Sequence, residues 1–414
     1  MQLWGLREVA MIDLSEFFEI QARLVAGIPL TRRKTFTKKI NWEARLLGII
    51  GARGTGKTTL LLQQLNDKSD KRQEHLYISA DHVQVQAMGL YEIASAFFKL
   101  GGQSILIDEI HKFAGWSREV KSLYDSFPQA RVAFSGSSTL ALQKGGGDLS
   151  RRAVIYSLPG LSFREYMIFV KGIARPPVDL AELLQKHSEL AKEMADKGPI
   201  LKYFRDFLDY GVYPYFLEGV NEYLPRLLNA LEKVFYEDIP SAIGIKVSNI
   251  PTLKKMLWLI ATSQPFIPNI ERMSRDLKIS KEFVYTYLEA LERARLLSGI
   301  PPAESGYRMV RKPSKIYVEN TNLLRALAGH GVDGAKPGTI RETFFAQQIR
   351  GAGLNLHIPR RGDFLVENRY IFEVGGKSKG GNQIYGERDA YLVRDDIEVG
   401  YGDVVPLWLF GFLY

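Results

Sequence analysis

The sequence contains no cysteine among its 414 residues. This absence excludes disulfide bonds, a thiol nucleophile and zinc held by thiolates, and it is typical of proteins from a reducing compartment. The six histidines are scattered, and none stands at the spacing of a metal site. The apolar run at 404–414 is too short to span a bilayer, and the charged N-terminal segment does not fit a secretory signal. We therefore expect a cytoplasmic protein with no membrane partner.

Charge and length set further limits. The net charge of +9 permits an acidic partner, and between Thr31 and Lys57 eight basic residues accompany a single acid, Glu43. Charge alone, however, favours a well-solvated basic surface. A chain of this length, with 46% hydrophobic residues, is expected to fold into two or three domains.

Strand and helix patterns alternate over the first part of the chain. Apolar runs with the length of buried parallel strands are separated by helical stretches; they lie at 46–50, 76–78, 105–107, 132–134 and 154–158. Repeated strand–helix units predict an α/β fold, a parallel sheet with helices on both faces. We expect this domain at 41–172, after an N-terminal helix and basic lead-in at 1–40.

The rest of the chain falls into three regions with different sequence patterns. Residues 173–249 are expected to form a helical region. Residues 250–328 have the order helix, helix, sharp turn, helix and two strands, which is typical of a winged helix-turn-helix. After a glycine-rich linker at 329–338, residues 339–414 predict a small α/β domain that begins with a helix and continues with strands.

Residues 51–58, GARGTGKT, match the P-loop pattern G-x-x-x-x-G-K-[ST] at every specified position, with a strand before and a helix after. Glycines allow backbone N–H groups to wrap phosphates, and the helix N-terminus adds its positive dipole end. Lys57 is expected to reach the β- and γ-phosphates, and the Thr58 hydroxyl to bind magnesium. The expected contacts to ATP come from Gly51, Arg53, Gly54, Thr55, Gly56, Lys57, Thr58 and Thr59.

A second motif supports the first. The apolar strand 105–107 is followed by Asp108 and Glu109, at the carboxyl edge where open α/β sheets bind ligands. Asp108 is expected to hold Mg²⁺ through water, and Glu109 to orient or deprotonate the attacking water. The two motifs together predict an ATPase that uses ATP and Mg²⁺.

Beyond these motifs, the chain resembles a widespread group of prokaryotic AAA-type P-loop ATPases that carry a C-terminal domain of unknown function. The resemblance extends from about residue 32 to the end. It is carried by GARGTGKT (51–58), LIDEIHK (106–112), WSREVKSLY (116–124), FSGSS (134–138), DLSRR (148–152), LPGLSFREY (158–166), GVYP (211–214) and KIYVEN (315–320).

This resemblance implies two further catalytic residues. Ser137 would occupy the place of the polar sensor that detects the γ-phosphate, although a simple serine-rich turn is the alternative. Arg152, preceded by Arg151, matches the position of an arginine finger acting in cis or in trans, and a surface arginine pair is the alternative. His111 is expected only to orient a loop.

Duplex DNA is a candidate partner through the winged helix-turn-helix, with helix 281–295 in a groove and segment 308–315 on phosphates. The candidate contacts are Lys281, Tyr285, Tyr287, Arg293 and Arg311. Glu282, Glu289 and Glu292 on the same helix would repel a phosphate backbone, so a packing role is the alternative.

The last domain resembles a restriction-endonuclease-like fold, in which a helix glutamate and a D…(D/E)-x-K series hold magnesium and activate water. The corresponding acids are Glu342, Asp363 and Glu373. Alternation along the strand requires the lysine at position 375, which is Gly375, and the nearest lysine is Lys377. The site is therefore either shifted or decayed, and the missing lysine argues against an active nuclease.

These observations predict an ATP-binding protein that hydrolyses ATP with Mg²⁺ to drive or gate a conformational change between domains. One alternative is an ATP-regulated DNA-binding or protein-interaction switch with little turnover, and another is an ATP-dependent nuclease. A protein partner or self-association is compatible with either reading.

Overall fold

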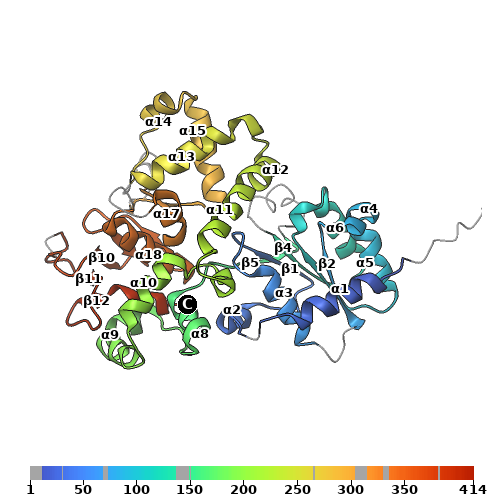
Figure 1. Ribbon diagram of the computed structural model, residues 1–414, viewed down its shortest axis with the longest axis horizontal. Coiled ribbons are helices and arrows are strands. Elements are labelled where there is room, and N and C mark those ends of the chain that lie inside the picture. Colours follow the sequence, from blue (N-terminus) through green and yellow to red (C-terminus); the bar gives the residue numbers. More distant parts are fainter. Residues whose placement is uncertain are drawn as a thin grey trace, which may run out of the picture. The chain divides into compact units, whose positions relative to one another are not determined.

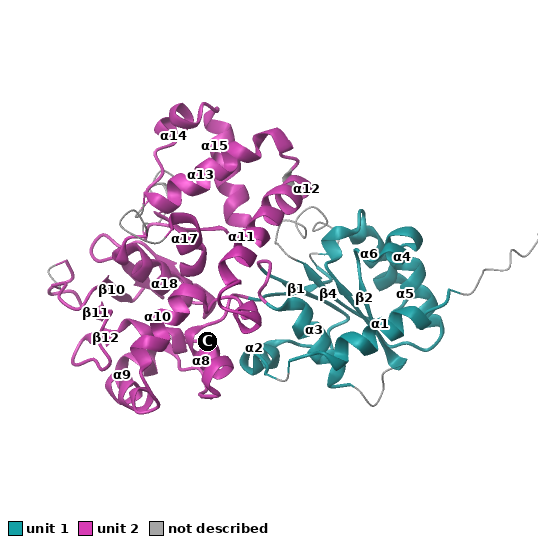
Figure 2. Ribbon diagram, viewed as in Figure 1, with its two compact units in different colours: residues 1–51, 56–158 teal, residues 52–55, 159–414 magenta. Residues whose placement is uncertain are grey.

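The computed structural model describes residues 12–29, 31–68, 73–136, 149, 151–263, 266–303, 315–329, 335–380 and 383–414. The chain forms two compact units, which Figure 2 shows in different colours. Unit 1 comprises residues 1–51 and 56–158, and unit 2 comprises residues 52–55 and 159–414. Four residues of the P-loop motif are thus grouped with unit 2.

Unit 1 is built on a five-stranded parallel sheet in the order β2-β3-β4-β1-β5 (Figure 1). The strands are β1 (Leu46–Ile50), β2 (His75–Ser79), β3 (Ser104–Asp108), β4 (Arg131–Gly136) and β5 (Val154–Ser157). Strand β4 lies between β1 and β3, so the chain leaving β1 and the chain leaving β3 emerge on either side of the end of β4. This order positions the two predicted motifs at one sheet edge.

Helices cover both faces of this sheet, as expected. They are α1 (Ser15–Ala26), α2 (Lys34–Lys39), α3 (Lys57–Asn66), α4 (Val83–Met88), α5 (Leu90–Lys99) and α6 (Trp116–Ser126), with a 3₁₀ turn η2 (Ile110–Lys112). Ile107 packs on one face in the core that contains Ile93 of α5 and Val120 of α6. Ile49 packs on the other face with Leu61 of α3. Apolar side chains pointing both ways explain the continuous hydrophobic runs of these strands.

Unit 2 begins with a helical region. Its elements are α8 (Phe163–Lys171), α9 (Leu180–Ala195), α10 (Ile200–Tyr210), η3 (Pro214–Glu218), α11 (Tyr223–Lys233), η4 (Val234–Asp238), α12 (Ile239–Ile243) and η5 (Val247–Asn249). Helix α8 was expected in the ATPase domain ending at 172, but it lies in unit 2. The physical reason is aromatic packing, since the Phe163 ring contacts Phe204 and Phe207 of α10 and Trp408 near the C-terminus.

The next elements follow the order expected from the sequence: α13 (Ile250–Thr262), α14 (Ile270–Leu277), α15 (Lys281–Arg293), β6 (Leu297–Ile300) and β7 (Lys315–Val318). Strands β6 and β7 pair antiparallel as a two-stranded sheet. Ser280 caps α15 by accepting a hydrogen bond from the Phe283 N–H, which explains the sharp turn before this helix.

The C-terminal part of unit 2 contains a mixed five-stranded sheet in the order β12-β11-β10-β9-β8. Strands β10, β11 and β12 are parallel, and β9 and β8 are antiparallel to their neighbours. The elements are α17 (Thr321–Ala328), α18 (Pro337–Gly351), β8 (Leu356–His357), β9 (Phe364–Val366), β10 (Tyr370–Gly375), β11 (Ala390–Arg394), β12 (Val404–Pro406) and η6 (Leu407–Phe412).

Contacts unite the regions expected at 173–249, 250–328 and 339–414 into one unit. The LSFREY segment contributes directly, because Ser162 Oγ and Arg164 Nε both donate to the Tyr414 carbonyl oxygen, at 2.7 and 2.8 Å. Asn322 at the start of α17 accepts a hydrogen bond from the Val212 N–H at 2.9 Å. Among the described residues, no helix combines the length and apolarity that crossing a membrane requires.

Candidate functional site

The loop between β1 and α3 has the backbone conformation that phosphate binding requires. Gly54 and Gly56 adopt positive φ angles of 81° and 90°, which side-chain-bearing residues rarely adopt. Lys57 begins α3, is only 5% exposed, and its Nζ donates to the Gly51 carbonyl oxygen at 3.1 Å. Thr55 Oγ1 donates to the Ala52 carbonyl oxygen at 3.0 Å. The loop is therefore fixed by its own contacts.

Asp108, the last residue of β3, accepts hydrogen bonds from three hydroxyl groups. Thr58 Oγ1 lies 2.6 Å and Tyr77 OH lies 2.9 Å from Asp108 Oδ2, and Ser135 Oγ donates to Oδ1. Burial, together with the charge of Asp108, raises the pKa of Tyr77 far above its ordinary value, so its hydroxyl remains a donor at neutral pH. Thr58 and Asp108, the two residues expected to bind magnesium, therefore lie next to each other.

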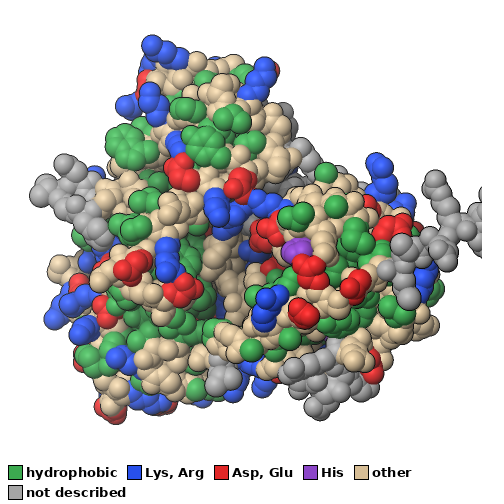
Figure 3. Space-filling view, turned by 45° about the vertical axis from the view of Figure 1, so that its right-hand side comes forward, with side chains coloured by type: hydrophobic (Ala, Val, Ile, Leu, Met, Phe, Trp, Pro, Cys, Tyr) green, Lys and Arg blue, Asp and Glu red, His purple; other side chains and the backbone are tan. Residues whose placement is uncertain are grey.

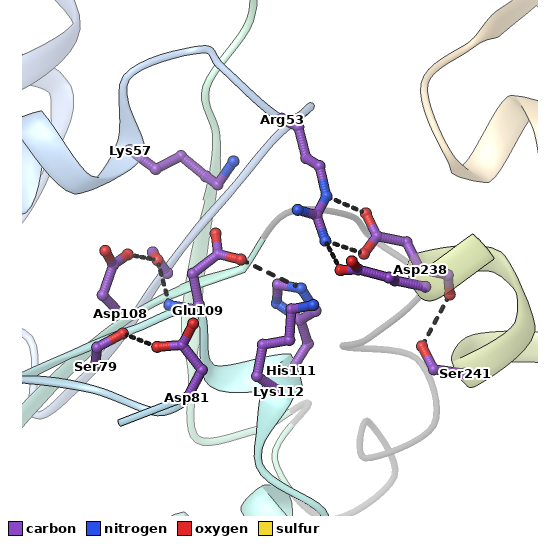
Figure 4. A network of polar contacts seen from close by, with 12 residues as sticks. Arg53, Lys57, Ser79, Asp81, Asp108, Glu109, His111, Lys112, Asp238 and Ser241 are labelled. Carbon is purple, nitrogen blue, oxygen red and sulfur yellow. Dashed lines mark hydrogen bonds and ion pairs between the residues drawn. The ribbon is translucent and has the colours of Figure 1, made fainter. Parts of the chain in front are cut away.

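Glu109 has a strained backbone. Its φ of 51° and ψ of 40° lie in the left-handed region, which destabilises a residue with a side chain by about 1 kcal/mol or more. The Ser135 hydroxyl accepts from the Glu109 N–H at 3.0 Å, and the Lys112 N–H donates to the Glu109 carbonyl at 2.8 Å. The Glu109 carboxylate lies 3.5 Å from Nε2 of His111 (Figure 4), and the loop-orienting role expected of this histidine stays a prediction.

Arg53, a residue of the phosphate loop, forms ion pairs with two acidic residues, Glu237 and Asp238. Its guanidinium lies 2.9 and 2.7 Å from the two carboxylate oxygens of Asp238, and 3.0 Å from Glu237 (Figure 4). Asp238 is only 3% exposed and ends η4, a π-helical turn that lies two residues before Pro240. Proline has no N–H to donate to the preceding turn, a physical reason for the helix to widen there.

Tyr215 contacts the same part of the loop. A Cβ built on Gly54 would lie 2.6 Å from the Tyr215 ring, and this ring stacks on Tyr213 with 5.6 Å between centroids. Tyr213 in turn accepts a hydrogen bond from Asn320 Nδ2 at 2.9 Å. The GVYP and KIYVEN segments therefore meet beside the phosphate loop, and Gly54 is needed there for space as well as for its φ angle.

The structure gives less information on the other residues predicted for the site. Ser137 lies outside the described residues. Arg152 extends to Asp125 at the end of α6, with 3.5 Å between Nη2 and Oδ1, and its guanidinium lies 5.8 Å from the centre of the Tyr124 ring. Arg151 is exposed, and Thr59 is half-buried on the first turn of α3. The roles of Arg152 and Ser137 remain predictions.

Sequence reasoning missed Ser135, Tyr77, Tyr215 and Asp238. Ser135 could have been found, because it lies near the end of the strand that neighbours β3, in the same FSGSS segment as Ser137. Tyr77 stands in an apolar strand and looks like a core residue. Asp238 lies 185 positions from Arg53, and no local signal connects the two.

The three helices at 250–293 present few of the expected DNA contacts. Tyr287 is buried and packs inside the helical group, so its expected contact with a DNA groove is wrong. Lys281 Nζ lies 2.7 Å from Glu271, and Arg293 is paired with Glu289. Tyr285 is exposed, and Arg311 lies outside the described residues. Figure 3 shows basic side chains at the top of the molecule, where α14 and α15 lie.

The C-terminal acids are placed on or beside the mixed sheet. Glu373 lies on β10, Asp363 immediately precedes β9, and Glu342 lies on α18. The lysine that reaches the first two is Lys379, whereas Lys377 is exposed. Lys377 was only the nearest lysine in sequence, and the lysine beside the acids is Lys379 because the loop after β10 returns two residues later.

Parts of the chain are similar to known protein families. Residues 43–167 match the family described as an AAA domain, and residues 201–333 match the family described as a domain of unknown function (DUF8612). An uncharacterized protein of Methanocaldococcus jannaschii is 26% identical over 388 residues, which are 87% of this chain and 81% of the relative.

Two solved structures are similar to parts of the chain. AMPPCP-bound DnaA from Aquifex aeolicus is 14% identical, with a TM-score of 0.27, and the match covers 68% of this chain and 89% of that one. The Hsp104–ADP complex of S. cerevisiae is 17% identical, with a TM-score of 0.31, over 68% of this chain and 42% of that one.

Proposed function

Because the chain carries an AAA-type P-loop ATPase domain at residues 43–167, followed by a domain of unknown function at 201–333, we propose that it binds ATP with Mg²⁺ and hydrolyses it. One observation carries the proposal. The Thr58 hydroxyl lies 2.6 Å from Asp108 Oδ2, directly beside a glycine loop in phosphate-binding conformation. A hydroxyl and a carboxylate converging beside backbone N–H groups suit a cation that is shared with a phosphate.

The residues fit both parts of the ligand. The loop N–H groups from Gly51 to Gly56, the N-terminus of α3 and the Lys57 ammonium would bind the phosphates. Thr58 and Asp108 would hold Mg²⁺, Asp108 through water, and oxygen donors are the ligands that this ion prefers. When bound, Mg²⁺ would neutralise charge on the β- and γ-phosphates. Tyr77 and Ser135 fix the orientation of Asp108.

Glu109 is the proposed general base. It follows Asp108 directly, so its carboxylate starts from the same sheet edge, and it would accept a proton from the attacking water. Its left-handed backbone is held by Ser135 and turns the side chain toward His111. Ser135 therefore contacts both acids and is proposed as the residue that positions them relative to each other.

Hydrolysis is proposed to drive a conformational change through Arg53. The residue lies inside the phosphate loop, yet its guanidinium is bound by Glu237 and Asp238 at the junction of η4 and α12. A movement of the loop when phosphates bind or leave would pull on this ion pair and on the π-helical turn that carries it. Such a turn is a place where a helix can change register.

The test is phosphate release by wild type and by Glu109→Gln, which keeps size and hydrogen bonding but cannot accept a proton. We expect ATP affinity to be retained and turnover to fall by roughly 10²-fold or more, the range for removal of a general base. Glu92→Gln, at an exposed position of α5, is the matched control and should turn over like wild type. Equal turnover in Glu109→Gln and wild type would assign the base to another residue.

A further inference from the structure

A lysine side chain in the C-terminal sheet ends inside a cage of oxygen atoms. The Nζ atom of Lys379 lies 3.1 Å from Asp363 Oδ2, 3.0 Å from the Val374 carbonyl oxygen and 3.5 Å from Glu373 Oε1. Three oxygens from three residues therefore converge on one point, and a positive charge occupies it. An ammonium group has three N–H bonds, one for each of these oxygens.

The cage is fixed by the sheet. Glu373 and Val374 are consecutive residues of β10. Asp363 is held against the same strand by two hydrogen bonds: its N–H donates to the Phe372 carbonyl at 2.9 Å, and the Val374 N–H donates to its Oδ2 at 2.8 Å. The Asp363 carboxylate is thus fixed relative to β10 by contacts that do not involve the lysine.

Gly375 explains how the lysine enters. A Cβ at this position would lie 2.3 Å from Cδ and 2.8 Å from Cβ of Lys379, distances at which atoms collide. The stem of Lys379 fills the space that a side chain at position 375 would take. Glycine at position 375 therefore makes room for Lys379. The positive charge beside the acids comes from this lysine, four residues further along the chain.

The cage also contains an incompletely bound carboxylate. Glu373 is 2% exposed, and its Oε2 atom has no hydrogen-bond partner among the residues that the structure describes. A buried carboxylate oxygen in this state is unfavourable, and such an atom indicates a site that can accept a further or more highly charged ligand. The two carboxylates face the Lys379 ammonium, and the buried Arg394 on the neighbouring strand also interacts electrostatically with Glu373.

Glu342, the third acid expected in this region, is bound elsewhere. Its Oε2 accepts from Lys315 Nζ at 2.8 Å and from Tyr317 OH at 2.7 Å. Within the described ranges, no group of three or more histidine, aspartate or glutamate side chains could hold a metal ion. Because the Lys379 ammonium lies between Asp363 and Glu373, these acids do not fit a resident metal as the wild-type chain stands, which differs from what the restriction-endonuclease-like resemblance implies.

We propose that the cage formed by Asp363, Glu373 and the Val374 carbonyl is a latent site for a divalent cation, Mg²⁺ or Mn²⁺, and that the Lys379 ammonium is its resident cation. Wild-type protein binds no metal there, because an ion would have to displace a tethered charge. Removal of the lysine leaves the buried Glu373 carboxylate, the partly buried Asp363 carboxylate and the Val374 carbonyl oxygen next to one another. Hard oxygen donors of this kind bind Mg²⁺ and Mn²⁺, and the metal would replace the lost charge.

The experiment is a Mn²⁺ titration by calorimetry of the nucleotide-free full chain, which keeps the result independent of ATP hydrolysis. Four proteins are compared: wild type, Lys379→Ala, Lys379→Met and the double variant Asp363→Asn/Lys379→Ala. We expect Lys379→Ala to bind one more Mn²⁺ ion than wild type. The double variant should lose this added ion, and Lys379→Met, whose side chain fills the same space without charge, should bind fewer ions than Lys379→Ala.

Two results would overturn the proposal. One is a Mn²⁺ site in wild type that Asp363→Asn removes, because the cage would then accept a metal beside the lysine. The other is a folded Lys379→Ala protein, judged by circular dichroism, that binds no additional ion. If Lys379→Ala does not fold without metal, recovery of its folding on addition of Mn²⁺ supports the proposal. Equal Mn²⁺ binding by wild type and by Asp363→Asn supports it independently of that variant. Lys377→Ala, at the neighbouring exposed lysine, should behave as wild type.

Discussion

Two regions of this protein place a lysine and two acids at the end of a buried strand, and they use the lysine differently. In unit 1, Lys57 donates to the Gly51 carbonyl, and Asp108 is held by the hydroxyl groups of Thr58, Tyr77 and Ser135. In unit 2, Lys379 lies directly on the carboxylates of Asp363 and Glu373. Hydroxyl groups orient a carboxylate without cancelling its charge, whereas an ammonium group does cancel charge.

The difference follows from how each lysine is attached. Lys57 starts a helix after a glycine with positive φ, so the backbone directs its stem along the phosphate loop. Lys379 lies on a short loop after β10, and the bare backbone of Gly375 lets its stem fold back onto the strand. We therefore propose that the site in unit 1 can bind both an anionic phosphate and a cation. In the site of unit 2, the Lys379 ammonium occupies the position of a cation.

The largest expected effect comes from Gly54→Ala. The new Cβ would meet the Tyr215 ring at 2.6 Å and would also oppose a φ of 81°. We expect loss of detectable ATP binding. The proposed difference between the loop at 51–58 and the cage around Lys379 would then be lost. Gly101→Ala is the matched control, because Gly101 has a similar φ of 95° and no atom within 4 Å of the built Cβ. Calorimetry with Mg²⁺ and ATP measures both, and normal binding by Gly54→Ala would show that the loop tolerates this change.

A smaller effect is expected from Ser135→Ala. The variant leaves an Asp108 oxygen and the Glu109 N–H without their shared hydroxyl. A hydrogen bond to a charged group contributes about 1.5–3 kcal/mol, so phosphate release should fall by roughly 10- to 100-fold while ATP remains bound. Ser79→Ala is the control, since Ser79 ends the neighbouring β2 and donates to Asp81 instead. Unchanged release by Ser135→Ala would leave the sensor role to Ser137.

The smallest effect on binding is expected from Arg53→Ala, which tests whether the phosphate loop communicates with unit 2. Affinity for ATP should change by no more than a few-fold, because backbone groups supply the main phosphate contacts. Hydrogen–deuterium exchange in residues 223–243 should respond to ATP in wild type and no longer respond in Arg53→Ala. Asp238→Asn should reproduce the effect, and Arg226→Ala, at an exposed arginine paired with Glu218, should not. An ATP response that persists without Arg53 would contradict the coupling.

Features with a local cause were predictable from the sequence. The phosphate motif lies in eight consecutive residues, and Asp108 and Glu109 directly follow an apolar strand. The helices and strands between 250 and 318 also agree with the expected order, because periodicity, Ser280 as a cap and the lengths of the apolar runs are properties of the local chain.

Features that depend on the path of the chain were not predictable. Ser135, rather than a later serine, contacts Asp108 because β4 lies beside β3 in a particular register. Arg53 meets Asp238 only after the helical region has folded back to the loop. Strand alternation correctly identified position 375 as facing the acids, but it could not show that a lysine four residues later would fill that position.

The central claim is that the loop at 51–58 binds ATP with Mg²⁺, and calorimetric titration of Mg²⁺ and ATP into wild type and Lys57→Ala tests it most directly. Lys57 is the side-chain cation proposed to bind the β- and γ-phosphates. The account predicts one ATP bound per wild-type chain and no detectable binding by Lys57→Ala, with the far-ultraviolet circular dichroism of the two proteins superimposable. Wild-type protein that binds no ATP, or a Lys57→Ala variant that binds it equally well, would contradict the account.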